Sequence, residues 1–180
     1  MKKTVAVIGS RGAIGNAVVD TLLADESVEA VFKFSRAEIT EHDDKVKHIF
    51  IDIEDEESIK QATESLPEDT KFDLIFVATG ILHDEKNVFP EKSIKDISFD
   101  KLIKVLTINT IGPTLVGKYF IPYLRKDSKS TFAFLSARVG SISDNKLGGW
   151  YSYRASKTAL NQIIRNFSIE VARSNKNAIF

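Results

Sequence analysis

The chain contains no cysteine. This absence excludes a disulfide scaffold, a zinc or iron–sulfur site held by thiolates, and a cysteine nucleophile. An excess of one charge is absent as well, because 25 Lys and Arg balance 25 Asp and Glu in 180 residues. Nucleic-acid-binding domains normally carry a basic excess. Apolar runs are also short, and none approaches the ~20 residues that span a bilayer. We therefore expect neither a nucleic acid nor a membrane among the partners.

The first apolar run is too short for a secretory signal. It spans residues 4–8, follows two lysines and stops at Gly9, whereas a signal peptide needs a longer apolar segment. We therefore expect a cytoplasmic protein. No metal site is expected either, because the histidines show no metal-ligand spacing. These histidines are His42, His48 and His83.

Short apolar runs alternate along the chain with longer amphipathic stretches. The runs are continuous in their apolar character, which is typical of parallel strands that are covered on both faces. Strand–helix alternation predicts a parallel sheet with helices on both sides. The expected fold is α/β: one doubly wound, three-layer α/β/α domain over residues 1–180, for which the dinucleotide-binding Rossmann fold is the leading candidate. The predicted strands lie at 5–8, 30–34, 49–51, 74–78, 132–135 and 178–180, and the predicted helices at about 16–24, 58–66, 99–124 and 151–174.

The last apolar run, Ala178–Phe180, stands at the end of the chain. It looks like the opening of a sixth strand, and a strand after a long helix still needs covering on its outer face. We therefore expect a C-terminally truncated domain whose remainder lies beyond Phe180. The alternative is a short edge strand that ends the domain.

A glycine-rich segment joins the first predicted strand to the first predicted helix. It reads Gly9-Ser10-Arg11-Gly12-Ala13-Ile14-Gly15 and holds three of the nine glycines of the chain. In dinucleotide-binding folds such glycines allow a sharp turn, close approach to the pyrophosphate and tight helix–strand packing. Backbone N–H groups at the helix N-terminus then bind the phosphate charge. The segment predicts a nucleotide site, with a tight turn and no ligand as the alternative. Its candidate cofactor residues are Gly9, Ser10, Arg11, Gly12, Ile14 and Gly15.

The end of the second predicted strand favours NADP(H) over NAD(H). NAD-binding folds place an Asp or Glu about 20 residues past the loop, where it binds the ribose 2′-hydroxyl. Here Arg36 follows the strand and Arg11 lies in the loop, and guanidinium groups suit a 2′-phosphate. Glu38 is a nearby candidate for the opposite preference. Asp52 and Ile53, after the third strand, are candidates at the adenine, although Asp52 could instead be the N-cap of the next helix.

Tyr153 and Lys157 stand four residues apart on a predicted helix and therefore share one face. The pair opens the helix after the fifth predicted strand, at the sheet edge where ligands bind in such folds. A lysine ammonium beside a tyrosine stabilises the phenolate, so we expect a lowered tyrosine pKa. Such a phenol can donate a proton to a carbonyl oxygen, and take it back, near neutral pH.

The segment from Gly149 to Asn161, GWYSYRASKTALN, resembles the short-chain dehydrogenase/reductase family, and within it the C-factor-like and carbonyl-reductase-like branch. The resemblance covers the chain from Val5 to its last residue. It implies that Tyr153 is the catalytic acid/base and that Lys157 lowers its pKa and holds the nicotinamide ribose. It also implies that Asn109 positions a water for a proton relay, the alternative for this residue being a helix-interior kink. The implied phosphate contacts are Gly9, Gly12 and Gly15 for the pyrophosphate and Arg11 and Arg36 for the 2′-phosphate.

The segment after the fourth predicted strand departs from the family pattern. The family usually has Asn-Asn-Ala-Gly or Asn-Ala-Ala-Gly there, and this chain has Val77-Ala78-Thr79-Gly80. The asparagine contact is lost, while the small residues still leave room for the cofactor. The candidate cofactor residues in this segment are Ala78, Thr79 and Gly80.

The catalytic serine is the second departure. The family commonly has two serines at the end of the fifth strand and uses the second, whose place Ala137 takes here. Ser136 is therefore the candidate for orienting the substrate carbonyl, with Ser141 in reserve, and a mere strand end is the alternative for Ser136. The polar loop 138–150 that follows is expected to line the substrate entrance, with Trp150 as a wall of the pocket.

These features predict an NADP(H)-dependent oxidoreductase that interconverts a carbonyl compound and a primary or secondary alcohol by hydride transfer, with Tyr153 as acid/base. The resemblance also implies a homodimer or homotetramer. Two alternatives stay open at this point. One is a non-catalytic NADP(H)-binding sensor or signalling protein on the same fold, and the other is a structural partner of a longer subunit.

Overall fold

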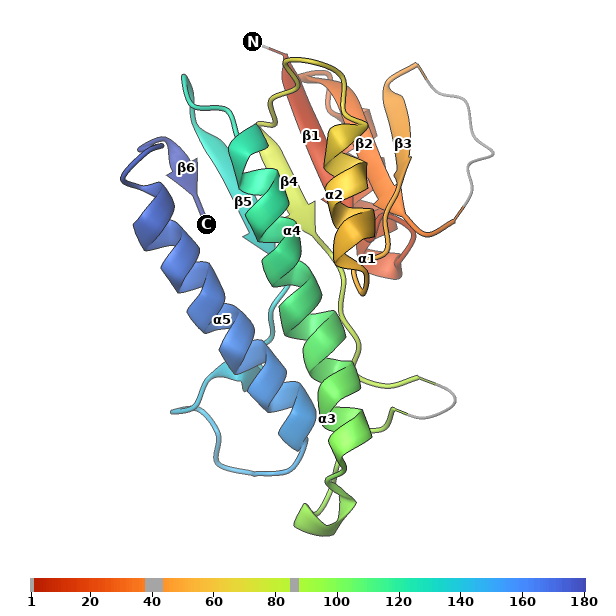
Figure 1. Cartoon of the computed structure of the whole chain (residues 1–180), viewed down its shortest axis with the longest axis vertical. Coiled ribbons are helices and arrows are strands. Elements are labelled where there is room, and N and C mark those ends of the chain that lie inside the picture. The colour runs from red at the N-terminus through yellow and green to blue at the C-terminus, as the bar shows by residue number, and fades with distance from the viewer. Residues whose placement is uncertain (1, 38–43, 85–87) are drawn as a thin grey trace.

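A parallel β-sheet forms the middle layer of the computed structural model, which describes residues 2–37, 44–84 and 88–180. Within these residues the strands are arranged in the order β3-β2-β1-β4-β5-β6, and every pairing is parallel (Figure 1). The order reverses between β1 and β4, and sheets of this kind bind ligands beyond the carboxyl ends of the strands at that point. The strands are β1 (Lys3–Ile8), β2 (Val28–Ser35), β3 (Val46–Phe50), β4 (Leu74–Val77), β5 (Ser130–Phe134) and β6 (Ala178–Ile179).

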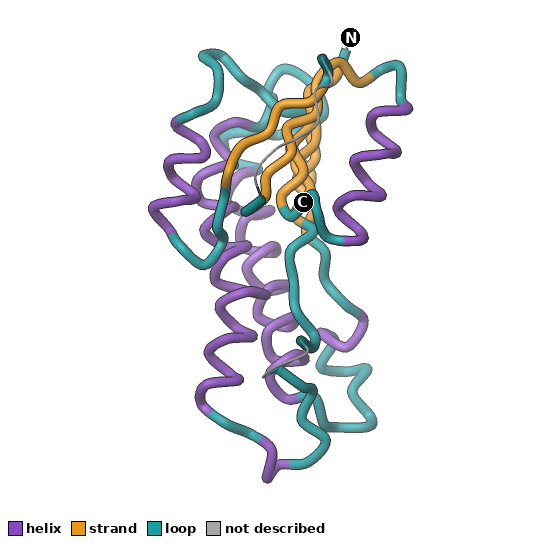
Figure 2. The backbone as a smooth tube through the Cα atoms, turned by 90° about the vertical axis from the view of Figure 1, so that its right-hand side faces the viewer, coloured by secondary structure: helices purple, strands orange, loops and turns teal. Residues whose placement is uncertain are grey.

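Helices cover both faces of this sheet, which Figure 2 shows edge-on. Helix α1 (Ala13–Ala24) packs against β1 and β2 on one face. The longer helical segments after β3 lie on the opposite side (Figure 2). The three layers confirm the doubly wound α/β fold expected from the sequence. The helices on the second side are α2 (Glu56–Glu64), α3 (Phe99–Leu106), α4 (Gly112–Phe120) and α5 (Tyr151–Val171).

The helix predicted over residues 99–124 is interrupted in the structure. A π-helical turn, Thr107–Ile111, separates α3 from α4. Pro113 gives the physical reason, because proline has no N–H to donate to the carbonyl of Asn109, four residues back, and its ring clashes there. Asn109 therefore lies in a segment that departs from α-helical geometry, which the sequence pattern did not predict as a break between two helices.

Two apolar clusters hold the layers together. Beneath α2 and α4 the cluster is rich in phenylalanine, and Phe34 packs edge-on against Phe120 with 5.1 Å between ring centres, a favoured aromatic geometry. At the edge of the sheet, β6 pairs with β5, and Phe180 stacks on Phe132 at 5.9 Å. Beneath α1 the cluster is formed by Val5, Val7, Val19, Val28 and Val31.

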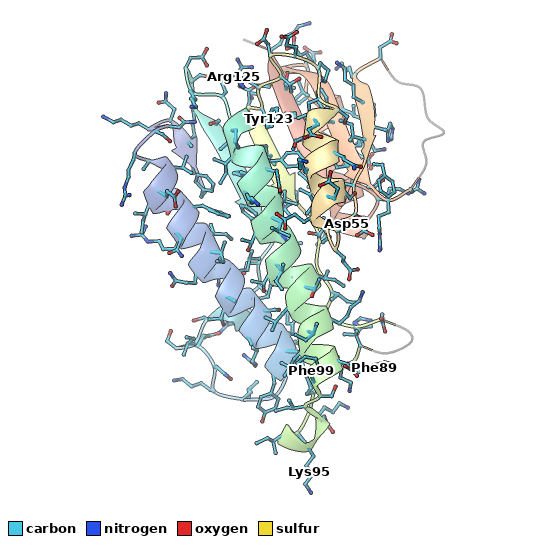
Figure 3. All side chains as sticks on the ribbon, in the orientation of Figure 1. Asp55, Phe89, Lys95, Phe99, Tyr123 and Arg125 are labelled. Atoms are coloured by element: carbon cyan, nitrogen blue, oxygen red, sulfur yellow. The ribbon has the colours of Figure 1, made fainter. Side chains whose placement is uncertain are left out.

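The start of α2 decides one alternative for Asp52. The carboxylate of Asp55 (Figure 3) accepts a hydrogen bond from the Glu57 N–H at 3.0 Å, so Asp55 is the N-cap of α2. The N-cap alternative for Asp52 is therefore wrong. Asp52 lies just before the helix, where its carboxylate accepts from the Glu54 N–H at 3.0 Å and its own N–H donates to the Ser58 hydroxyl at 2.9 Å.

Candidate active site

The glycine loop after β1 is closed by backbone contacts. Gly9 has a φ of 81°, which glycine adopts without strain, and its N–H donates to the Phe34 carbonyl of β2 at 3.0 Å. A Cβ atom at Gly15 would overlap the Gly9 carbonyl oxygen, so α1 approaches the loop only because residue 15 is glycine. The first turn of α1 carries no acidic residue. The positive end of its dipole is therefore available to an anion.

Two other predicted residues of this loop differ in exposure. Ser10 is fully buried and its hydroxyl donates to the Phe34 carbonyl at 3.2 Å, so its side chain ties the loop to β2. Ile14 lies in the first turn of α1 and is 51% exposed. A cofactor contact of either residue stays a prediction.

A crevice of about 460 Å³ opens where the strand order reverses, between the loop after β1 and the segment after β4. Sequence reasoning missed several of its lining residues, among them Glu54, Ile81 and Ile108, because their apolar or charged side chains carry no motif. The predicted cofactor residues that line the crevice are Gly9, Arg11, Gly12, Arg36, Ile53, Ala78, Thr79 and Gly80.

Thr79 gives the crevice an unpaired polar atom. Its Oγ1 is buried and has no hydrogen-bond partner among the described residues. Buried polar atoms are normally paired, so an orphan at a crevice wall suits a bound polar group. The loop and this wall are also close, since a Cβ atom at Gly9 would stand 2.8 Å from Thr79 Cγ2. The glycine loop, the open N-terminus of α1 and Thr79 together fit a dinucleotide.

The rim of the crevice carries paired charges. Glu54 accepts a hydrogen bond from the Lys104 ammonium of α3 at 2.7 Å and faces the Arg36 guanidinium at 3.9 Å. The Arg36 side chain is 68% exposed, and Arg11 is also exposed. Lys104 thus neutralises the carboxylate nearest to Arg36, a pairing across fifty residues that the sequence does not signal. Glu38, the candidate for the opposite preference, lies outside the described residues.

Lys157 is buried beside this crevice. Only 3% of the residue is exposed, and its ammonium donates to the Leu135 carbonyl at 2.9 Å. A Cβ atom at Gly80, in the crevice wall, would stand 3.2 Å from the Lys157 Nζ. Burial lowers the pKa of this ammonium from 10.5 to about 8. Lys157, on α5, therefore lies against the same crevice that the glycine loop lines.

Tyr153 lies one turn earlier on α5. The Lys157 Nζ stands 5.9 Å from the centre of its ring. The ring of Trp150 meets the ring of Tyr153 nearly at right angles, with 6.3 Å between centres. Burial raises the pKa of the Tyr153 hydroxyl above its ordinary value. The lowered pKa expected from the sequence is therefore wrong for this structure, because burial disfavours the charged phenolate.

Asn109 joins three segments of the site. It is fully buried, and its Oδ1 accepts from the Ile81 N–H at 2.7 Å while its Nδ2 donates to the Ile81 carbonyl at 2.9 Å. The same Nδ2 donates to the Ser156 hydroxyl at 3.0 Å, and that hydroxyl donates to the Tyr153 carbonyl at 2.8 Å. Asn109 thus ties the segment after β4 to the helix of Tyr153, and Ser156 is a contributor that sequence reasoning missed.

The serine candidates do not pair with Tyr153 in the structure. The Ser136 hydroxyl donates to Asn161 Oδ1 of α5 at 2.6 Å. Ser141 and Ser143 share a hydrogen bond between their hydroxyls at 3.3 Å. A role of Ser136 or Ser141 in orienting a substrate stays a prediction, and the partner Asn161 had no sequence signal.

No helix in residues 2–37, 44–84 and 88–180 is long and apolar enough to cross a membrane. Across the same ranges no cluster of three or more histidine, aspartate or glutamate residues could hold a metal ion. His42 lies outside the described residues.

The doubly wound sheet, the glycine loop and the crevice at the strand-order reversal define a dinucleotide-binding protein of the Rossmann class. The family model of the short chain dehydrogenases matches residues 3–179. The chain therefore belongs to the short-chain dehydrogenase family and is an NAD(P)-dependent oxidoreductase.

The relatives agree with this assignment. The chain is 27% identical over 178 residues to 1-hydroxy-2-glutathionyl-2-methyl-3-butene dehydrogenase of Rhodococcus sp. (strain AD45), covering 98% of this chain and 74% of that protein. It is 34% identical over 79 residues to C-signal of Myxococcus xanthus, covering 44% of this chain and 48% of C-signal. Among solved structures, the NADPH-bound carbonyl reductase from chicken fatty liver is similar with a TM-score of 0.84 and 25% identity, covering 99% of this chain and 73% of that one.

Proposed function

We propose that the protein is an NADP(H)-dependent oxidoreductase that interconverts a small carbonyl compound and a primary or secondary alcohol, with Tyr153 as acid/base. One observation carries the proposal. Lys157 is buried with its ammonium between the Tyr153 ring and the Gly80 wall of the crevice, so a substrate that reaches Tyr153 also reaches the cofactor site. The family resemblance further supports a cytoplasmic homodimer or homotetramer.

Different residues bind the cofactor at the two ends of the crevice. The glycine loop and the N-terminus of α1 bind the pyrophosphate, because backbone N–H groups and the helix dipole favour negative charge there. Arg11 and Arg36 bind the 2′-phosphate, which a guanidinium can contact with two parallel hydrogen bonds. At the other end Lys157 holds the nicotinamide ribose. Bound NADPH supplies the hydride that reduces the carbonyl carbon.

Tyr153 transfers the proton to and from the substrate oxygen. Its hydroxyl donates to the carbonyl oxygen as negative charge develops there, and in alcohol oxidation the phenolate takes the proton back. When Lys157 is protonated, its positive charge stabilises the Tyr153 phenolate. With a pKa of about 8, the ammonium is mostly charged at neutral pH. Asn109 and Ser156 hold the Tyr153 turn of α5 against the crevice.

NADP(H) is the proposed cofactor because the rim is positive where the adenine ribose would lie. Lys104 and Arg36 share the Glu54 carboxylate, so the positive charges outnumber the negative charge at this rim. The solved carbonyl reductase from chicken fatty liver is an NADPH-bound structure, which supports the same preference.

A Tyr153→Phe variant tests the proposed function. We expect turnover of NADPH with a panel of ketones and aldehydes to fall by about 100-fold or more, because the proton donor is gone, while NADPH binding measured by fluorescence persists. Tyr151→Phe is the matched control, since Tyr151 lies two residues earlier on α5 and is 37% exposed. Equal turnover in wild type and Tyr153→Phe would contradict the role of Tyr153.

A non-catalytic NADP(H)-binding sensor is the second candidate. It is favoured by the absence of a serine at position 137 and by the bond of Ser136 to Asn161. The raised pKa of Tyr153 favours it too. The sensor would bind NADPH with wild-type affinity in Tyr153→Phe and turn over no carbonyl in either protein.

A further inference from the structure

Glu91 is a buried carboxylate that the proposed chemistry does not use. It is 1% exposed, and within the described part of the chain no cation pairs with it and its Oε1 has no hydrogen-bond partner. Burying a carboxylate without full compensation costs stability. The contacts that Glu91 does make must therefore offset this cost.

The partners that Glu91 does have lie at the start of α5. Its Oε2 accepts a hydrogen bond from the Ser152 N–H at 3.2 Å, and its backbone carbonyl accepts from the Trp150 N–H at 2.6 Å. The first N–H groups of a helix have no partners inside the helix, and the N-cap residue Trp150 makes no side-chain cap. Glu91 thus caps α5 from outside, and its negative charge suits the positive end of the helix dipole.

The chain enters α5 in a strained conformation. Gly148, Gly149 and Trp150 have φ values of 66°, 65° and 51°, and a left-handed φ is disfavoured for a residue as large as tryptophan. Gly149 also packs on the Glu91 carbonyl, which would stand 3.3 Å from a Cβ atom there. Such a conformation persists only where the surroundings enforce it, and Glu91 provides contacts on both sides of Trp150.

The segment 148–150, which leads into α5, contacts the candidate acid/base, Tyr153. The Trp150 ring contacts the Tyr153 ring, and Ser152, whose N–H Glu91 binds, is the residue before Tyr153. The helix that carries Tyr153 is therefore anchored at its first turn by a residue sixty positions earlier.

We propose that Glu91 is a positioning residue for Tyr153: its carboxylate fixes the first turn of α5 and the Trp150 ring, and thereby the placement of the Tyr153 hydroxyl. The inference rests on the proposed function of Tyr153. It predicts that loss of the carboxylate lowers the fraction of molecules with a productive Tyr153 and so lowers kcat, while the distant glycine loop still binds NADPH.

The test compares Glu91→Ala and Glu91→Gln with Asp96→Asn. Asp96 is the matched control, because its carboxylate also accepts backbone N–H groups, from Lys92 and Ser93, but it lies in an exposed turn and binds no N–H group of α5. We expect kcat to fall about 10-fold in Glu91→Ala, in line with loss of a helix cap, and about two- to five-fold in Glu91→Gln, which keeps an acceptor but loses the charge. The dissociation constant for NADPH should stay within about two-fold of wild type, and kcat of Asp96→Asn should equal wild type.

Tryptophan fluorescence supplies a readout that does not depend on turnover. Trp150 is the single tryptophan of the chain, so its anisotropy and its accessibility to acrylamide report on the entry to α5. We expect lower anisotropy and stronger quenching in Glu91→Ala, an intermediate signal in Glu91→Gln and no change in Asp96→Asn. The melting temperature of Glu91→Gln should not fall, because an uncharged amide costs less to bury than a carboxylate.

The outcomes separate this inference from the proposed function. Wild-type kcat and wild-type Trp150 signals in both Glu91 variants would overturn it. A parallel fall of kcat, NADPH affinity and melting temperature would also overturn it, since that pattern indicates general destabilisation. If Glu91→Ala does not fold, the kcat and the Trp150 signals of Glu91→Gln decide whether the inference holds. If the wild-type protein turns over no carbonyl, the proposed function fails, and the Trp150 signals still decide whether Glu91 holds the start of α5.

Discussion

The two ends of the crevice are built in different ways. At the glycine loop, backbone atoms make the contacts, and the charged side chains Arg11 and Arg36 are exposed. At the α5 end the side chains of Asn109 and Lys157 are buried, and each makes hydrogen bonds to other segments. The first end can change its charges without changing its shape, whereas each side chain of the second end holds others in place. Substitutions should therefore tune affinity at the loop and disrupt both stability and chemistry at α5.

Asn109 offers the strongest test of this contrast. Asn109→Ala removes hydrogen bonds to Ile81 and Ser156 and leaves buried polar groups unpaired, so we expect the free energy of unfolding to fall by about 3 kcal/mol. Urea unfolding measures the change. Asn166→Ala is the control, because Asn166 is exposed on α5 and should cost little. A loss below about 0.5 kcal/mol in Asn109→Ala would show that the network does not stabilise this end.

The pH dependence of stability tests the burial of Lys157. Its pKa is about 8 in the folded protein against 10.5 when solvated, so the unfolded chain binds more protons between these values and stability rises with pH there. From pH 8 to pH 10 the free energy of unfolding should increase by about 2 kcal/mol relative to Lys157→Met. Below pH 8 this relative gain should vanish.

Lys118→Met is the control for that titration. Lys118 is exposed and its pKa is raised by its bond to Glu56. It therefore does not increase the free energy of unfolding as the pH rises. A flat difference between wild type and Lys157→Met from pH 8 to pH 10 would mean that Lys157 is solvated in the folded protein.

The rim of the crevice should show the smallest effect. Arg36→Ala is expected to weaken NADPH binding by about 10-fold, the loss of one charge-assisted contact, and to leave NADH binding nearly unchanged. Equilibrium binding of both cofactors by fluorescence measures the ratio. Arg173→Ala, an exposed arginine after α5, controls for net charge. An equal loss for NADPH and NADH would assign Arg36 to a contact other than the 2′-phosphate.

Much of the fold was predictable because its signals are local. Continuous apolar runs predicted that each strand described above exists, although β3 begins three residues before the predicted run at 49–51. Gly9, Gly12 and Gly15 predicted the loop that lines the crevice or packs beneath it. The spacing of Tyr153 and Lys157 predicted their common face on α5. Each of these patterns lies within a few consecutive residues, and only the spacing of Tyr153 and Lys157 reflects a backbone period, that of the α-helix.

The sequence by itself thus determined the order of strands and helices, the glycine loop and the Tyr153–Lys157 pair. Tertiary structure alone decided the pairing of Lys104 with Glu54, the bond of Ser136 to Asn161 and the anchoring of α5 by Glu91. It also decided the direction of the Tyr153 pKa, because burial depends on every segment packed around the ring. The physical reason is distance along the chain: these contacts join residues 25 to 61 positions apart, and no local pattern records which distant group folding will bring near.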